Sequence, residues 1–151
     1  MGTCRTARDI MHPRVSLHAK DTGEDIAKKL MSPYPALPVV NDRTEVVGIV
    51  SEYDVLSALA EGRTVHEFSA QSIMSCGHAG HTDEPCKTPL TVTPVTSIQK
   101  IVDTFVKQNV TLLPVVDKGK LVGIISRTNV INSLAEKGFW PGSEMKKRTP
   151  K

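Results

Sequence analysis

The sequence predicts a mixed α/β fold built from two copies of a β-α-β-β-α unit that pack together through their sheets. Three observations predict it. The string LPVVN at 37–41 returns as LPVVD at 113–117, and VGIVS at 47–51 returns as VGIIS at 122–126. An amphipathic helical pattern precedes the first string of each copy. Ordered internal repeats of this kind indicate repeated structural units, so the two copies are expected to share one fold.

Each copy is expected to open with a short strand and a helix. The strands are predicted at Ser16-Leu17 and at Thr91-Val92. Residues at capping-box spacing mark the helix starts, Asp21 with Glu24 and Thr96 with Gln99. The second copy's helix carries a buried stripe of Ile98, Ile101, Val102, Phe105 and Val106. The first copy's stripe is shorter, Ile26, Ala27, Leu30 and Met31, because Pro33 and Pro35 stop that helix.

A hairpin and a second helix complete each copy. The apolar, β-branched runs predict strands at 37–41, 46–50, 112–116 and 121–125, joined in pairs by polar turns. Helices follow near 52–61 and 127–137. The runs are nearly continuous rather than alternating, which is typical of sheets covered on both faces. A unit of roughly 60 residues buries too little surface to be stable alone, so each copy should cover the other's sheet.

The spacing of the repeat sets the predicted boundaries. Ile10-Met11 returns 63 residues later as Ile73-Met74, whereas the helix starts Asp21 and Thr96 are 75 residues apart, so the second copy carries 12 extra residues. The predicted division is a first repeat at 1–62, a linker at 63–72, a second repeat at 73–137 with an insertion at 76–89, and a tail at 138–151.

Composition and charge exclude several classes of protein. The chain is 39% hydrophobic and 23% charged, which excludes a wholly disordered chain, and no apolar run approaches the ~20 residues that cross a membrane. The formal charge of +3 equals that of residues 144–151, so the repeats are balanced and a nucleic-acid partner is not expected. With three cysteines and no leader, a cytoplasmic location is expected.

The repeated motif places residues that can cap a helix or bind a ligand at the end of each hairpin. Gly48 and Gly123 lie inside strand runs, where a glycine marks a close backbone approach or a bulge. Ser51 and Ser126 precede helices, so each can cap the helix or dock a phosphate at its N-terminus. Asp54 can interact with the helix dipole or accept two hydroxyl hydrogen bonds from a ribose.

With these residues the chain resembles a tandem CBS-domain pair, also called a Bateman module, over about residues 7–137. The resemblance is carried by residues 9–11, 37–40 and 48–54 and by their counterparts in the second copy. It implies pseudo-twofold symmetry and two clefts that bind adenosine compounds such as AMP, ADP, ATP or S-adenosylmethionine. It also implies a regulatory module that forms homodimers and needs no cofactor. Because no catalytic or transport domain shares the sequence, the output is expected to act on an effector protein in trans or through self-assembly.

The resemblance also implies roles for individual residues. In the family's motif the Ser contacts a phosphate and the Asp contacts the ribose, a pattern that Ser51 and Asp54 match in full. Ser126 matches as well, but Asn129 replaces the Asp, and an amide grips a diol less well than a carboxylate. The first cleft is therefore expected to be the better ribose site. The remaining expected contacts are Ala36, Leu37 and Pro38 with Val15 and Ser16 opposite for the base, and Arg127 for a phosphate.

The insertion raises an alternative function. Cys76, His78, His81 and Cys86 offer four zinc-type ligands, but their spacing matches no established zinc pattern, so no metal site is assigned. The same loop could instead make the chain a metal or redox sensor. A Cys76–Cys86 disulfide is geometrically possible but disfavoured in a reducing cytoplasm. The sequence shows no nucleophile–base pair, paired carboxylates or P-loop, so no enzyme activity is expected.

Overall fold

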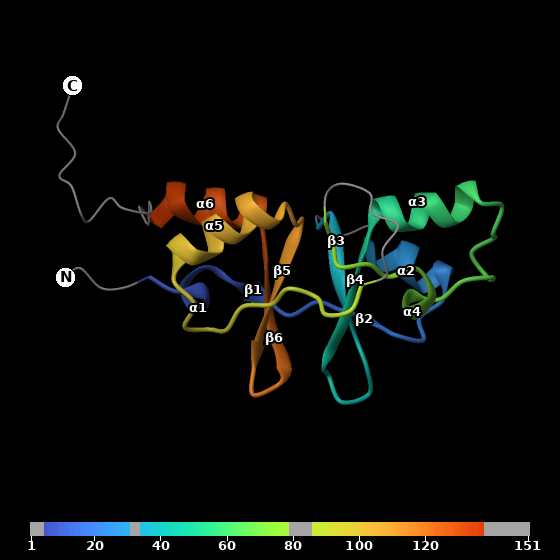
Figure 1. Ribbon diagram of the computed structural model, residues 1–151, viewed down its shortest axis with the longest axis horizontal. Helices are drawn as coiled ribbons and strands as arrows, with labels where there is room; N and C mark the ends of the chain where they lie inside the picture. Colours follow the sequence, from blue (N-terminus) through green and yellow to red (C-terminus); the bar gives the residue numbers. More distant parts are fainter. Residues whose placement is uncertain (1–4, 31–33, 79–85, 138–151) are drawn as a thin grey trace, which may run out of the picture.

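The computed structural model describes residues 5–30, 34–78 and 86–137 of the chain. Its elements follow one another as shown in Figure 1. In chain order they are α1 (Ala7–Ile10), β1 (His12–Pro13), β2 (Leu17–His18), α2 (Gly23–Leu30), β3 (Ala36–Val40), β4 (Val46–Ser51), α3 (Glu52–Ala60), α4 (Ala70–Ile73), α5 (Ile98–Gln108), β5 (Leu112–Asp117), β6 (Lys120–Ser126) and α6 (Arg127–Lys137).

Two three-stranded sheets form the centre of the molecule, with strand orders β2-β3-β4 and β1-β6-β5. The two long hairpins stand side by side in Figure 1, with α5 and α6 outside one and α2 and α3 outside the other. Both hairpins are antiparallel and have matching registers, with Ala36 opposite Ser51 and Leu112 opposite Ser126. The predicted mixed fold of two repeated units is confirmed.

The two copies bury their sheets against each other, as the continuous apolar runs predict. Ala36, Val40 and Ile49 of the first copy share one core cluster with residues of the second. The contributions from the second copy are Leu112, Leu121 and Ile124. At the turn end of the two hairpins, the Leu121 N–H donates to the Thr44 carbonyl at 3.0 Å, which joins one hairpin to the other. The half-core of each copy is therefore completed by the other.

The opening segments of the two copies are exchanged. In β1, His12 pairs with Ile124 of the second copy's hairpin, while Ser75 pairs with Ile49 of the first copy's hairpin. The short helices that precede them follow the same rule: α1 packs in the core that contains α5, and α4 packs in the core that contains α2. The repeat in the sequence is thus offset from the unit that packs in space, and the predicted domain division stays a prediction.

Gly48 and Gly123 mark the places where the exchanged segments approach the hairpins. A Cβ on Gly48 would lie 2.5 Å from Met74 Sδ, and one on Gly123 would lie 2.7 Å from Met11 Sδ. Each hairpin also shifts register beside its glycine, between Val39 and Val40 and between Val115 and Val116. Both readings of a strand glycine, a close approach and a bulge, therefore apply here.

The predicted capping boxes at Asp21 and Thr96 are wrong by one residue. In α2 the box is formed by Thr22 and Asp25, and donation from Thr22 lowers the pKa of the Asp25 carboxyl. In α5 the N-cap is Ser97, whose hydroxyl accepts from the Lys100 N–H at 3.1 Å. Asp21 and Thr96 instead accept hydrogen bonds from N–H groups three residues earlier, so they close the preceding turn and the helices begin later.

The strands before these helices also differ from expectation. The first is Leu17–His18, one residue later than predicted, and it pairs in parallel with β3. The second is reduced to a single bridge between Val92 and Val115. Met31, at the end of the first predicted helix, lies outside the described residues. The same is true of Pro33, which is predicted to stop that helix. Among the helices that the structure describes, none is long and apolar enough to cross a membrane.

Candidate functional site

The first candidate site is the turn between β4 and α3, where Ser51 and Asp54 face each other. The Ser51 N–H and hydroxyl both donate to Asp54 Oδ2, at 2.8 and 3.0 Å, and the Asp54 N–H donates to Ser51 Oγ at 3.3 Å. This reciprocal pattern is a capping box, so the helix-capping interpretation of the serine is correct. It also holds the carboxylate in one orientation at the end of the hairpin.

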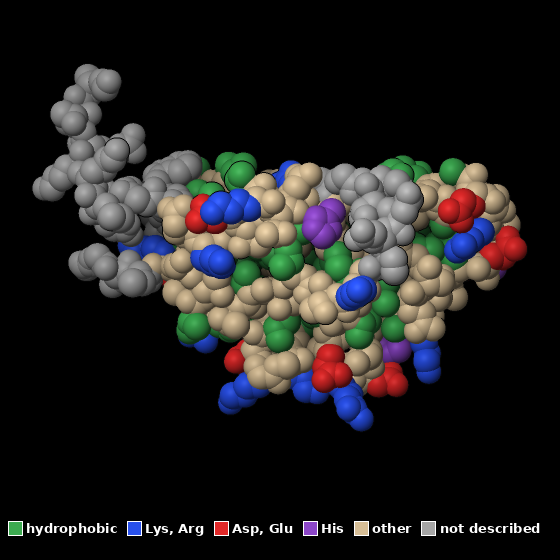
Figure 2. Space-filling model, viewed as in Figure 1, with side chains coloured by type: hydrophobic (Ala, Val, Ile, Leu, Met, Phe, Trp, Pro, Cys, Tyr) green, Lys and Arg blue, Asp and Glu red, His purple; other side chains and the backbone are tan. Residues whose placement is uncertain are grey.

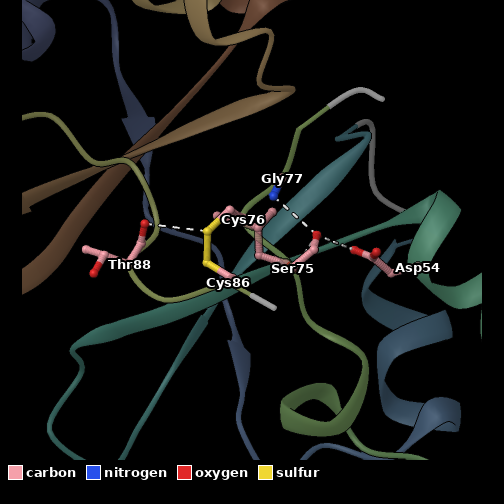
Figure 3. Close-up of a disulfide and its surroundings, with 7 residues drawn as sticks. Asp54, Ser75, Cys76, Gly77, Cys86 and Thr88 are labelled. Atoms are coloured by element: carbon pink, nitrogen blue, oxygen red, sulfur yellow. Dashed lines mark hydrogen bonds between the residues drawn. A yellow bond between two sulfur atoms is a disulfide. The ribbon is translucent and has the colours of Figure 1, made fainter. Parts of the chain in front are cut away.

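Sequence reasoning missed a further residue at this site, Ser75. Its hydroxyl donates to Asp54 Oδ2 at 3.0 Å across 21 residues of sequence, and its Oγ accepts from the Gly77 N–H at 3.2 Å (Figure 3). The exchange of the opening segments brings Ser75 here. The only sequence signal was its place directly after the repeated Ile73-Met74, a pattern that gives no indication of which hairpin the segment joins.

The second candidate site is the equivalent turn between β6 and α6. The Ser126 N–H donates to Asn129 Oδ1 and the Asn129 N–H donates to Ser126 Oγ, both at 3.1 Å. Both residues are buried, with exposed fractions of 3% and 9%. The turn has the geometry of the first site but carries a neutral amide in place of the carboxylate.

Arg127 follows Ser126, and its guanidinium is held by the segment after α5. Nε donates to the Val110 carbonyl at 3.0 Å and Nη2 donates to Asn109 Oδ1 at 2.9 Å. Asn109 has a left-handed backbone with φ of 52°, which ends α5 and presents these acceptors. The predicted contact between Arg127 and a phosphate stays a prediction, because in this arrangement the side chain already has two partners.

A groove of about 420 Å³ opens beside Arg127 between α5 and α6. Its walls are mostly apolar, formed by Val102, Phe105, Val106, Asn109, Arg127, Val130 and Ile131. Val106 and Ile131 are exposed large hydrophobic residues, as are Tyr53 and Leu56 on α3. Within the described residues, the outer helix surfaces of both copies therefore carry exposed apolar side chains.

The residues predicted to contact a base lie close to Ser51 but are largely buried. All five residues of β3, including Ala36, Leu37 and Pro38, are buried, and Ala36 is directly opposite Ser51. Val15 and Ser16 are half-buried and lead into β2, which pairs with β3 from Leu17. The structure thus brings the predicted base-contact residues together beside the first turn, and their binding role stays a prediction.

The two turns differ in charge. The first turn of α3 holds two acidic residues, Glu52 and Asp54. The first turn of α6 holds no acidic residue and begins with Arg127. A hydroxyl-rich group therefore suits the first turn and an anion suits the second, because helix N-termini favour anions only where nearby charges do not oppose them. Other charged side chains gather at the opposite edge of the molecule, around the hairpin turns (Figure 2).

The insertion forms a disulfide between Cys76 and Cys86, with a Cα–Cα distance of 5.1 Å (Figure 3). The sequence left this disulfide geometrically possible but disfavoured, and the structure forms it, with the two cysteines within bonding geometry. Cys76 Sγ also lies 3.5 Å from the Thr88 carbonyl oxygen. His78 forms a bridge with Val110, whereas His81 lies outside the described residues. In the part of the chain that the structure describes, no three potential ligands cluster around a metal position.

Comparison with known proteins identifies related chains. A family model described as the CBS domain matches residues 7–61 and 84–136. The curated CBS domain-containing protein CBSX2, chloroplastic, from Arabidopsis thaliana is 30% identical over 149 residues, which cover 85% of this chain and 63% of that protein. The chain spans between 18% and 63% of the length of the first curated relatives that it matches.

Solved structures show the same fold. The crystal structure of Arabidopsis CBSX2 in complex with AMP has a TM-score of 0.70 and 26% identity, and the match covers 89% of this chain and 98% of that chain. The CBS domain pair of protein MJ0100 has a TM-score of 0.72 at 22% identity, with 89% of this chain and 99% of that chain covered. Both neighbours are CBS-domain pairs, like the two repeats described above.

Proposed function

Because this chain is a member of the CBS domain family, we propose that it is a regulatory module that binds an adenosine-containing ligand between its two repeats. The observation that carries the proposal is the turn of Ser51 and Asp54, where a fixed carboxylate stands beside the small, buried end of β3. The similarity to CBSX2, whose structure is described in complex with AMP, supports AMP as the first ligand to test.

Asp54 is proposed to hold the ribose. Within the described residues, the hydrogen bonds to this carboxylate all reach Oδ2, which leaves Oδ1 able to accept from a ligand. A carboxylate has about four acceptor positions, so it can keep its helix-capping bonds and accept hydroxyl groups as well. Ala36 opposite Ser51 leaves the smallest apolar side chain at the adjoining end of the sheet, which favours a flat base there.

The second turn is proposed to be a weaker ribose site and a better neighbour for phosphate. Asn129 offers one carbonyl acceptor, and its Oδ1 already accepts from the Ser126 N–H. Arg127 supplies the positive charge that the first turn lacks. The phosphate of a ligand held at Asp54 is therefore expected to favour the side of the second copy.

The signal is proposed to pass to a separate effector protein, through a change in the relative stability of two arrangements of the repeats. We also propose a homodimer, supported by the exposed Tyr53, Leu56, Val106 and Ile131 on the outer helices. A cytoplasmic location remains part of the proposal. The proposed function requires only ligand binding, and it assigns no catalytic step or resident cofactor to the chain.

The alternative function, a redox sensor, is favoured by one observation. Cys76 and Cys86 form a disulfide next to the residues that contact Asp54. The metal form of this alternative has no comparable support, because a disulfide removes both thiolates from the set of ligands.

A thermal-shift panel and calorimetry with AMP, ATP, S-adenosylmethionine and zinc test the proposal. A ligand at 100 times its Kd stabilises by about 2.7 kcal/mol, which for a chain of this size corresponds to about 5–10 °C in Tm. We expect such a shift with an adenosine compound. A shift with zinc that a chelator reverses, together with none from the three adenosine compounds, would replace the proposal by a metal sensor.

A further inference from the structure

The disulfide lies one residue from the candidate ribose site. Cys76 follows Ser75, whose hydroxyl donates to Asp54 Oδ2, and precedes Gly77, whose N–H donates to Ser75 Oγ. The backbone of Ser75 is paired in both directions with Ile49 of β4, at 2.7 and 2.8 Å. The Gly77 carbonyl accepts from the Thr111 N–H at 2.9 Å, so this short segment touches both copies.

The bond that holds this segment can be reached by other molecules. Cys76 and Cys86 are both half-buried rather than enclosed. Cys76 lies in residues 62–83, between the two segments that match the family model, whereas Cys86 lies within the second of those segments. Disulfides in reducing compartments are usually transient and redox-sensing, so a bond at this position in a cytoplasmic chain suits regulation better than permanent stabilisation.

We propose that Cys76–Cys86 is a thiol–disulfide switch that lowers ligand affinity at Asp54 when it is oxidised. This inference rests on the proposed function, because it regulates the same site. The oxidised bond fixes Cys76 and thereby keeps the Ser75 hydroxyl on Asp54 Oδ2, so that a ribose diol can reach only Oδ1. Reduction releases the tether, so Ser75 can leave the carboxylate to the ligand.

The chemistry requires a dithiol reductant. One thiolate of the reductant attacks a sulfur of the disulfide, the Cys76–Cys86 bond breaks, and a mixed disulfide forms with one cysteine. The second thiol of the reductant then displaces that cysteine. Two electrons and two protons pass from the dithiol to the protein, which ends with two thiols while the reductant ends as a disulfide.

The experiment measures AMP affinity of the full chain by calorimetry in both redox states. It uses a Cys4→Ser background so that only Cys76 and Cys86 change, and alkylation with mass spectrometry verifies each state. We expect the reduced protein to bind AMP about 5-fold or more tightly than the oxidised protein, the lower end of typical coupling between sites. Hydrogen exchange without ligand should show faster exchange of the Ser75 and Gly77 amides after reduction.

Two variants separate the switch from a general effect of the bond. Ser75→Ala should bind AMP equally in both states, with the affinity of the reduced parent. Cys76→Ser combined with Cys86→Ser should have that same affinity and no response to reductant. Equal affinity of the parent in both states, tighter binding by the oxidised form, or free thiols after oxidation would overturn the switch alone. Absence of AMP binding in both states would overturn the proposed function and the switch with it.

Discussion

The two repeats end their hairpins in turns of the same geometry but opposite charge. In each, a serine caps the following helix, and the side chain of the residue three positions later accepts a hydrogen bond from the serine N–H. The first turn carries Glu52 and Asp54, whereas the second carries Arg127 and the neutral Asn129. The difference teaches that helix capping constrains the backbone of both turns, while capping alone accepts either an acid or an amide at the third position.

The exchanged opening segments add a second difference between the two turns. Ser75 reaches the carboxylate of the first turn, but its counterpart His12 pairs through its backbone with Ile124 and has its ring near the Tyr34 hydroxyl, with Nδ1 at 3.5 Å. The first turn therefore has an additional side-chain contact from the other copy's opening segment. A ligand bound at Asp54, as proposed above, would therefore lie next to this segment.

The largest loss of AMP affinity is expected from a substitution at Asp54. Replacing Asp54 with Ala should weaken AMP binding by about 10–150-fold, because a charge-assisted contact of about 1.5–3 kcal/mol is lost. The matched variant Asn129→Ala should have a smaller effect, since only a neutral acceptor is removed. Calorimetry on both variants measures the contrast, with melting curves to show that each is folded. Equal losses at the two positions would contradict the assignment of the ribose to the first turn.

The two strand glycines should respond differently to alanine. Gly48→Ala and Gly123→Ala should each lower the free energy of unfolding by about 1–3 kcal/mol through overpacking. Near Gly48 the closest atoms belong to the Met74 side chain, whereas Gly123 also lies against the His12 carbonyl, 2.9 Å from the added Cβ. Urea unfolding of double variants should therefore show that Met74→Ala relieves Gly48→Ala, while Met11→Ala relieves Gly123→Ala less.

The second turn should be converted towards the first by a single change. Asn129→Asp should raise the affinity of the second cleft by about 10-fold, near the lower end of the effect expected at Asp54, because a charged acceptor replaces a neutral one. Calorimetric titration should show unequal sites in the parent and more similar sites in the variant. Two identical tight sites in the parent protein would contradict the predicted difference.

The smallest effect is expected from the tail, which lies outside the described residues. Removing residues 144–151 deletes the whole formal charge of +3 but little apolar surface. The free energy of unfolding should change by less than about 0.5 kcal/mol, as for surface changes in general. A large fall in Tm would show instead that the tail packs on one of the repeats.

The local elements could be predicted from the residues because their causes are local. The hairpin strands β3 to β6 and the helices α3 and α6 follow from β-branched runs and serine caps, which act over a few positions. The same locality explains the errors at the helix starts. Asp21 and Thr22 are both good caps, and the choice between them depended on Asp21 closing a turn with the His18 N–H.

Which hairpin receives each opening segment is a property of the three-dimensional packing. Ile10-Met11 and Ile73-Met74 are nearly identical locally, so no pattern within either segment distinguishes one hairpin from the other. The decision depends on long-range fit, such as the packing of methionine side chains over Gly48 and Gly123. That exchange brings Ser75 to Asp54 and sets the disulfide beside it. Contacts between residues far apart in the chain carry no periodicity, and therefore they appear only once the sheets have packed.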